Sequence, residues 1–137
     1  MKVFLDTNVV IDFMGEREGF FESASTIFSM IEEGKIHASV SVLTIINCAY
    51  ILKKAYSQEV MFDKVNDLCQ LLDVMPIDKS QLQNAVNMKP SDYEDAVQYL
   101  SALPYHPDLI ITRDKKGFSD FDIPLMTPAE FVDRAKA

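Results

Sequence analysis

The feature that most constrains the fold is an alternation of short apolar segments with longer segments of helical periodicity. In the longer segments apolar residues recur every three or four positions, which is typical of helices that pack on one face. The short segments have the length and composition of buried strands. Strands are expected at residues 2–5, 37–40, 73–77, 109–112 and 123–126, and helices at residues 20–31, 42–55, 60–72, 79–88, 91–103 and from 127 onward.

Strands that alternate with helices imply βαβ crossovers and a mainly parallel sheet with helices on both faces. We therefore predict the α/β class, as one three-layer α/β/α domain over residues 1–137. Apolar residues go nearly all the way round the helix at 42–55, which predicts that it is mostly buried. The patterns Ser91-x-x-Glu94 and Thr127-x-x-Glu130 predict capping boxes at the starts of the last two helices.

The composition predicts a soluble globular protein, with 48% apolar and 25% charged residues. No apolar run approaches the roughly 20 residues that span a bilayer, and no feature at the N-terminus suggests secretion. We expect a cytoplasmic protein with no membrane partner, in which Cys48 and Cys69 are buried thiols.

The net charge of −8 argues against non-specific binding to nucleic acid, because its long-range field repels a polyanion. It does not exclude nucleic acid as a substrate. Bound cations can neutralise clustered carboxylates and so reverse the local field of a site. An acidic surface equally suits a basic protein partner.

Three acids fall at equivalent positions of the expected fold. Asp6 ends the first strand, Asp114 follows the strand at 109–112, and Asp95 lies in the first turn of the helix after Ser91. In a parallel sheet, the carboxyl ends of strands and the N-termini of the following helices share one edge, where ligands bind. The three carboxylates are therefore expected to converge. Singly, each is equally well explained as a helix cap or a favourable charge at a helix N-terminus.

Converging carboxylates suit a hard divalent cation such as Mg²⁺, which one or two carboxylates usually hold while water and substrate phosphates complete the shell. Such a site positions water for in-line attack on a phosphodiester, without a side-chain nucleophile. Asn47 is a further candidate on the helix at 42–55. It is either a core amide with satisfied hydrogen bonds or a neutral ligand that reaches the acids.

These residues resemble the PIN domain superfamily, and within it the bacterial VapC-type toxins. The resemblance rests on Leu5-Asp6-Thr7-Asn8, on Glu94-Asp95-Ala96 and on Ile110-Ile111-Thr112-Arg113-Asp114, and it extends over almost the whole chain. It implies an α/β/α fold whose acidic pocket binds Mg²⁺ or Mn²⁺ and hydrolyses RNA internally. It also implies a small antitoxin as inhibitory partner and a homodimer.

Mapped onto this sequence, the resemblance makes Asp6, Asp95 and Asp114 the catalytic and metal-binding acids, supported by Asn8 and Thr112. The chain departs from the VapC-type pattern at two positions that usually carry acids, which here are Asn47 and Gly117. Fewer charged ligands should weaken intrinsic metal binding. Asp92 shares a helix face with Asp95 and is a candidate extra carboxylate, or else a solvated acid in a helix first turn.

Basic residues next to the expected pocket are Arg113, Lys115 and Lys116. They are candidates for contacts to RNA phosphates, which orient a strand without reading its sequence. The alternative is a solvated run of surface charge.

The leading hypothesis is a divalent-metal-dependent endoribonuclease that is the toxin of a toxin–antitoxin pair. A second hypothesis is a catalytically weakened PIN-like module that binds RNA or protein. A third is phosphotransfer through an aspartyl phosphate on Asp6, for which the chain carries Asn8 where one phosphatase pattern expects an aspartate.

Overall fold

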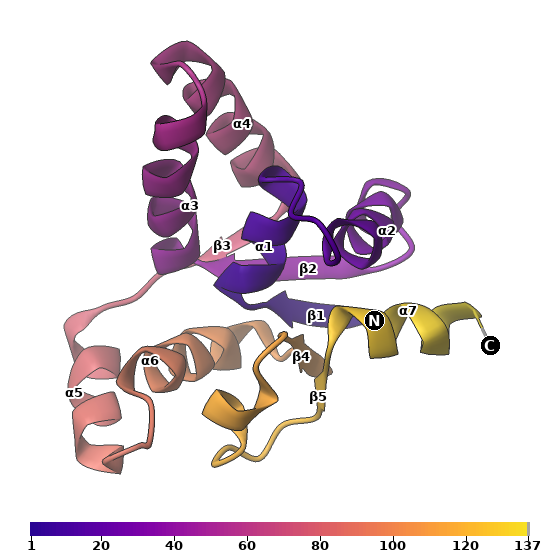
Figure 1. The fold of residues 1–137 in the computed structure, drawn as a ribbon. Coiled ribbons are helices and arrows are strands. Elements are labelled where there is room, and N and C mark those ends of the chain that lie inside the picture. Colours follow the sequence, from indigo (N-terminus) through magenta and orange to yellow (C-terminus); the bar gives the residue numbers. More distant parts are fainter. Residues whose placement is uncertain (137) are drawn as a thin grey trace.

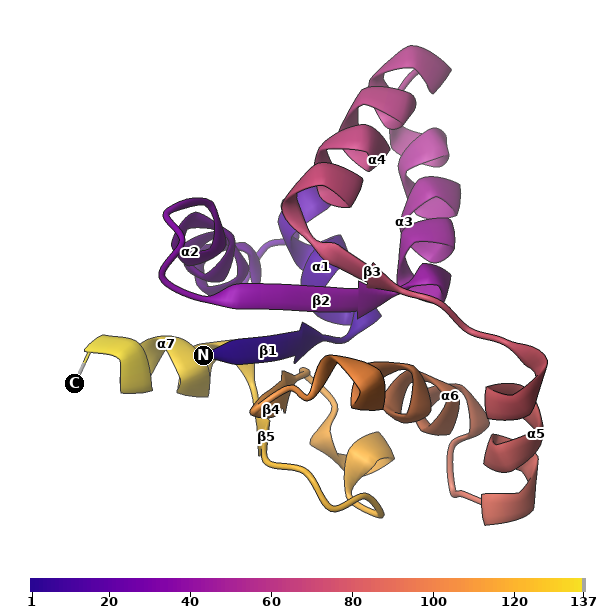
Figure 2. The ribbon, with the colours of Figure 1, turned by 180° about the vertical axis from the view of Figure 1, so that it is seen from behind.

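A parallel β-sheet lies at the centre of the protein. The computed structural model describes residues 1–136, in which five strands pair in the order β3-β2-β1-β4-β5, with every neighbouring pair parallel (Figures 1 and 2). The α/β fold predicted from the sequence is therefore confirmed. The strands are β1 (Lys2–Leu5), β2 (His37–Ser41), β3 (Asp73–Met75), β4 (Leu109–Ile111) and β5 (Leu125–Met126).

Helices cover both faces of the sheet, and successive side chains of β1 point into the two cores between the sheet and these helices. Val3 and Leu5 enter the larger hydrophobic core, whereas Phe4 points the other way into a second core. The larger core is covered by α1 (Thr7–Met14), α2 (Phe21–Glu32), α3 (Val42–Ala55), α4 (Gln58–Leu71) and α7 (Pro128–Lys136). On the opposite face lies α6 (Tyr93–Ala102), with α5 (Lys79–Met88) packed against it.

The order of the strands reverses between β1 and β4. The chain moves from β1 outward to β2 and β3, and then returns to the other side of β1 to form β4 and β5. Phe4 of β1 pairs with Ile110 of β4, so these two strands end side by side. A crevice at the carboxyl ends of strands opens where such a reversal occurs, and it is the usual ligand site of open α/β sheets.

Helix α3 has the bounds expected from the sequence, but it is not mostly buried. Ile46 is 60% exposed and Tyr50 56% exposed. The helix packs on α4, α1 and the sheet with one side only, and its other side faces solvent in the part of the chain described. The apolar residues all round α3 predicted burial on every side, but neighbouring elements cover only one side of the helix.

Two local features also differ from the expectation. Helix α1 was not among the expected helices, because its run Val9-Val10-Ile11 is β-branched and has a weak helix propensity. Burial of this run against the core stabilises the helix. The N-cap of α6 is Asp92, not Ser91, and Asp92 accepts from the Asp95 backbone N–H at 2.9 Å. The capping box of Thr127 and Glu130 is confirmed, since each accepts from the backbone N–H of the other.

The two cysteines are free, and only one is a core thiol. Cys48 is buried, and burial raises its pKa to about 12. Cys69 is exposed on α4, so the expectation that both are buried is wrong for Cys69. Among residues 1–136, none of the helices has the length and apolar character needed to cross a membrane.

Candidate active site

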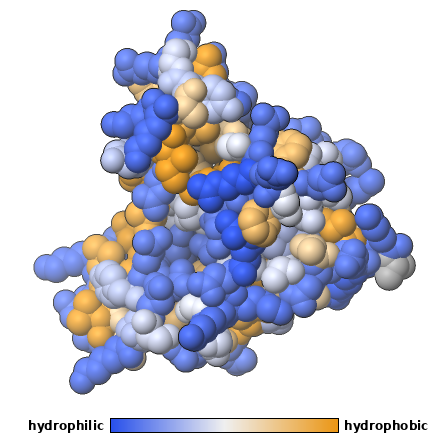
Figure 3. Space-filling model, in the orientation of Figure 1, coloured by the Kyte–Doolittle hydropathy of each residue, from blue (hydrophilic) through white to orange (hydrophobic). Residues whose placement is uncertain are grey.

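An acidic cleft opens at the carboxyl ends of β1 and β4, where the strand order reverses. Its volume is about 300 Å³. The space-filling view shows a hydrophilic surface between the α3–α4 hairpin and the α5–α6 pair (Figure 3). Five carboxylates line the cleft, from Asp6, Asp92, Glu94, Asp95 and Asp114. The structure thus brings together the three acids that the sheet-edge argument predicted to converge.

Asp6 is held rigidly at the end of β1. One carboxylate oxygen accepts from the Thr7 backbone N–H at 2.8 Å, so Asp6 is the N-cap of α1. The other oxygen accepts from the Thr112 hydroxyl at 2.8 Å and from the Asn8 amide at 3.2 Å. The capping role and the position in the cleft therefore coexist, and the rotamer of Asp6 is fixed by three donors.

The environment of Asp6 disfavours its ionised form. Burial raises the pKa of this carboxyl above its ordinary value, and the nearby charges of Glu94 and Asp114 add to the effect. The hydrogen bonds from Thr112 and Thr7 act against it without cancelling it. A cation in the cleft would remove this cost.

Asp95 lies in the first turn of α6, and it has the most strongly perturbed carboxyl of the cleft. Its pKa is raised to about 7, first by burial and then by the charges of Asp6, Asp92, Asp114 and Glu94. Burial and the four neighbouring acids all disfavour the ionised form of Asp95. Asp92 acts as the cap that fixes the backbone of Asp95, and it also lines the cleft.

Gly117 stands directly against the Asp95 carboxylate. A Cβ built at residue 117 would lie 2.9 Å from Cγ of Asp95 and closer still to its Oδ2. Because residue 117 has no side chain, the Asp95 carboxylate occupies the space that a Cβ would take.

Asp114 follows β4, and its carboxylate makes no cap hydrogen bond to the 3₁₀ turn Lys115–Phe118. The capping explanation for Asp114 therefore fails. Its backbone N–H donates to the Thr112 hydroxyl at 3.0 Å, so Thr112 connects the backbone of Asp114 to the carboxylate of Asp6. Asp114 is exposed and can turn its carboxylate toward a ligand.

The donor set of the cleft fits a hydrated divalent cation. Among residues 1–136 no group of three or more acid, histidine or cysteine side chains is already close enough to hold a metal ion by itself. Mg²⁺ needs only one or two carboxylates, because water and phosphate oxygens complete its octahedron. Fixed Asp6, half-buried Asp95 and exposed Asp114 meet that requirement. A bound cation would offset the burial and the repulsion that raise the pKa of Asp95.

A buried polar network beneath the cleft was not predicted from the sequence. The hydroxyls of Thr7 and Thr44 lie 2.7 Å apart, and the Gln98 amide donates to them at 3.0 and 3.2 Å. The network joins α1 and α3 on one face of the sheet to α6 on the other. Gln98 follows Asp95 by three residues, and this helical spacing is the signal that could have indicated it.

Asn47 is half-buried on α3, one turn after Thr44. It is not among the residues that line the cleft, and it is not a fully buried core amide. Thr44 takes the inward position of this helix, where it is completely buried.

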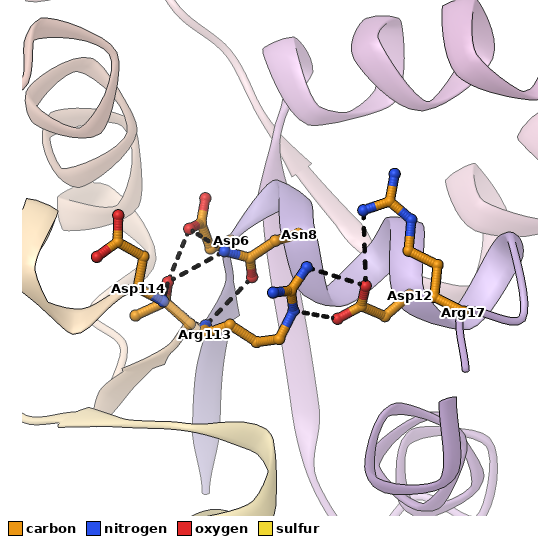
Figure 4. A network of polar contacts seen from close by, with 7 residues as sticks. Asp6, Asn8, Asp12, Arg17, Arg113 and Asp114 are labelled. Carbon is orange, nitrogen blue, oxygen red and sulfur yellow. Dashed lines mark hydrogen bonds and ion pairs between the residues drawn. The ribbon is translucent and has the colours of Figure 1, made fainter. Parts of the chain in front are cut away.

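The three basic candidates have different surroundings. The Arg113 guanidinium donates to the buried Asp12 through Nε at 2.5 Å and Nη2 at 3.2 Å (Figure 4). It also stacks on the ring of Phe20. Lys115 pairs with Glu130 at 2.9 Å. Lys116 is exposed and lies within the 3₁₀ turn.

Arg113 therefore acts on the site through its backbone. Its N–H donates to the Asn8 side-chain oxygen at 3.2 Å, which orients the Asn8 amide toward Asp6. In Figure 4 the Arg113 side chain lies between Asn8 and Asp12. Arg17, which the sequence did not single out, lies on the far side of Asp12 and lines the cleft.

Comparison with known proteins supports the fold. A family model described as the PIN domain matches residues 2–116. The chain is 27% identical over 138 residues to Ribonuclease VapC1 of Aquifex aeolicus (strain VF5), an alignment that covers 97% of this chain and 94% of that protein.

Two solved structures share the fold. A chain of a toxin-antitoxin complex from Klebsiella pneumoniae superposes with a TM-score of 0.68 at 19% identity, over 92% of this chain and 97% of that chain. A chain of VapBC-1 from nontypeable Haemophilus influenzae superposes with a TM-score of 0.67 at 17% identity, over 94% of this chain and 99% of that chain.

Proposed function

The chain belongs to the PIN domain family, and from this premise we propose that it is a divalent-metal-dependent endoribonuclease. The observation that carries the proposal is the cleft at the strand-order reversal, in which Asp6, Asp95 and Asp114 meet and the pKa of Asp95 is raised to about 7. The relative named Ribonuclease VapC1 supports RNA as the substrate. PIN-domain ribonucleases generally depend on divalent metal, and Mg²⁺ or Mn²⁺ suits the oxygen donors present here.

The reaction is hydrolysis, in which water attacks phosphorus in line and the bond from phosphorus to the leaving oxygen breaks. When bound, a divalent cation neutralises charge on the phosphodiester and lowers the pKa of water. Asp6, Asp95 and Asp114, which line the same cleft, are the residues that would hold the cation. Thr112 and Asn8 keep Asp6 in one orientation, so little reorganisation is needed during the reaction.

The experiment that tests the proposal is cleavage of single-stranded RNA by the purified chain. With Mg²⁺ or Mn²⁺ we expect internal cuts that disappear when EDTA removes the metal. A DNA strand of the same sequence is the control substrate. RNA that stays intact at every metal concentration tried would contradict the proposal.

The second candidate is a PIN-like module that binds without cutting. Asn47 and Gly117 favour it, because they replace acids at two positions of the VapC-type pattern. Calorimetric titration with Mn²⁺ separates the two. A functional cleft gives a site-specific heat that Asp95→Asn removes, whereas a weakened module gives none with either protein.

Gly117→Ala tests how closely the cleft depends on the space beside Asp95. The added methyl displaces the carboxylate, and misplacing a catalytic group by about 1 Å can cost on the order of 100-fold in rate. We expect kcat/KM to fall by about 10- to 100-fold, with little change in Tm because only the end of a side chain must move. Unchanged kcat/KM in the cleavage assay would show that Asp95 works from another position.

We further propose that the chain is the toxin of a toxin–antitoxin pair and forms a homodimer. The structural neighbours are toxin–antitoxin complexes, which supports a small antitoxin as partner.

The exposed apolar side chains of Ile46 and Tyr50 on α3, and of Leu82 and Val86 on α5, suit a second copy of the chain. Light scattering should give twice the chain mass of 15.5 kDa, and a monomeric mass would contradict the dimer.

A further inference from the structure

Arg17 has a position that its immediate neighbours do not explain. Of the described residues that line the acidic cleft, it alone is basic. It lies in the connection between α1 and α2, and its side chain is 47% exposed. Five carboxylates and one guanidinium thus share the same cleft.

The backbone of Arg17 is anchored while its side chain is not. Its N–H donates to the Asp12 carbonyl at 3.1 Å, and its own carbonyl accepts from the backbone N–H groups of Phe20 and Phe21 at 3.1 and 2.8 Å. These bonds connect the end of α1 to the start of α2. The point from which the side chain extends is therefore fixed relative to Asp6 and Asn8.

Asp12 does not need Arg17 as its counter-ion. The Asp12 side chain is 1% exposed, and Arg113 already neutralises it through two hydrogen bonds, at 2.5 and 3.2 Å. The Arg17 guanidinium is 4.0 Å from the nearer Asp12 oxygen, which is beyond hydrogen-bond distance. Arg17 is thus a second cation beside a satisfied carboxylate, and moving it away costs little.

We propose that Arg17 binds a phosphate group of the RNA strand that enters the cleft, as a residue that positions the substrate. The inference rests on the proposed function, because it names how the same cleft takes up a polyanion. A guanidinium offers a planar fork of donors that matches two phosphate oxygens. A cation bound by Asp6 and Asp95 would lie in the cleft that Arg17 also lines. Arg113 cannot substitute, because Asp12 and Phe20 hold its guanidinium.

The test compares Arg17→Gln, Arg17→Lys and the matched control Arg134→Gln, which removes the same charge from the last turn of α7. Binding of a fluorescent single-stranded RNA is measured over a salt series, in the Asp6→Asn protein so that no cleavage occurs. Each phosphate contact contributes about 0.7 to the slope of log K against log salt for a single strand. Arg17→Gln should lower that slope by about 0.7 and weaken binding by on the order of 10-fold at low salt.

Arg17→Lys should keep the slope and lose part of the affinity, because a lysine retains the charge without the fork. Arg134→Gln should leave both unchanged. A slope for Arg17→Gln equal to that of the parent would overturn the inference, as would an equal loss in Arg134→Gln. Thermal unfolding distinguishes a structural role, since a phosphate contact leaves Tm unchanged. If the protein without substitutions fails to cleave RNA, that result bears on the proposed function alone, because the binding series in the Asp6→Asn protein needs no cleavage.

Discussion

Asp6→Asn is expected to abolish metal-dependent RNA cleavage and to leave the fold intact. Asparagine has the same shape, and its oxygen can still accept from the Thr7 N–H that Asp6 caps. What is lost is the negative charge at the most rigid position of the cleft, together with the oxygen that accepts from the Thr112 hydroxyl and the Asn8 amide. Changes to partners outside the metal ligands typically cost 10- to 100-fold, so loss of a ligand charge should lower kcat/KM by at least about 100-fold.

Initial rates on single-stranded RNA at saturating Mn²⁺, together with circular dichroism spectra, check this prediction. The matched control is Asp63→Asn, which makes the same change on the exposed surface of α4. The control should cut at the parent rate. Asp6→Asn protein that is folded and cuts within a few-fold of the parent would exclude Asp6 as a ligand.

The convergence of Asp6, Asp95 and Asp114 could be predicted from sequence because it depends on topology and not on detailed packing. Each acid follows a strand or starts a helix, and both patterns are local in the chain. Once the elements form a parallel sheet, their ends share one edge whatever the side chains between them do. The periodicity of apolar residues therefore suffices to predict the fold, and the positions of the three acids relative to the strands and helices suffice to predict their convergence.

The surroundings of Arg113 and Arg17 were beyond that reasoning. Which of two arginines is held by Asp12, and which is left in the cleft, depends on how α1 sits against the end of β4. The exposure of Ile46 has the same origin, because it is set by which helices pack beside α3. Sequence spacing gives the face on which a residue lies, and tertiary packing decides what meets that face.

Without divalent metal, the stability of the protein should fall as pH rises from about 4 to about 7. The pKa of Asp95 is raised from 3.8 to about 7 in the folded state, whereas in the unfolded chain the carboxyl ionises near its ordinary value. Between those values the folded state binds more protons than the unfolded state, so raising the pH favours unfolding. Asp6 contributes in the same direction, because its pKa is also raised.

Asp95→Asn should therefore stabilise the metal-free protein above pH 7 and have little effect below pH 4. Asp95 is only half-buried, so solvent screening reduces the expected gain to about 1–2 kcal/mol. The same substitution should remove the stabilisation by Mg²⁺, since a ligand raises stability only through the state that binds it.

Thermal unfolding at pH 5 and pH 8, with Mg²⁺ or with EDTA, measures both effects in one series. The parent and the control Asp63→Asn should lose stability toward pH 8 in EDTA and regain it with Mg²⁺, whereas Asp95→Asn should show a flatter profile in both. The flattening follows from the burial of Asp95 and from its repulsion by the neighbouring acids, so it requires no cleavage activity. Parallel profiles for parent and Asp95→Asn, or an equal rise of Tm with Mg²⁺ in both, would mean that the cation is held without Asp95. In that case the carboxylates of Asp6 and Asp114 would have to carry the site.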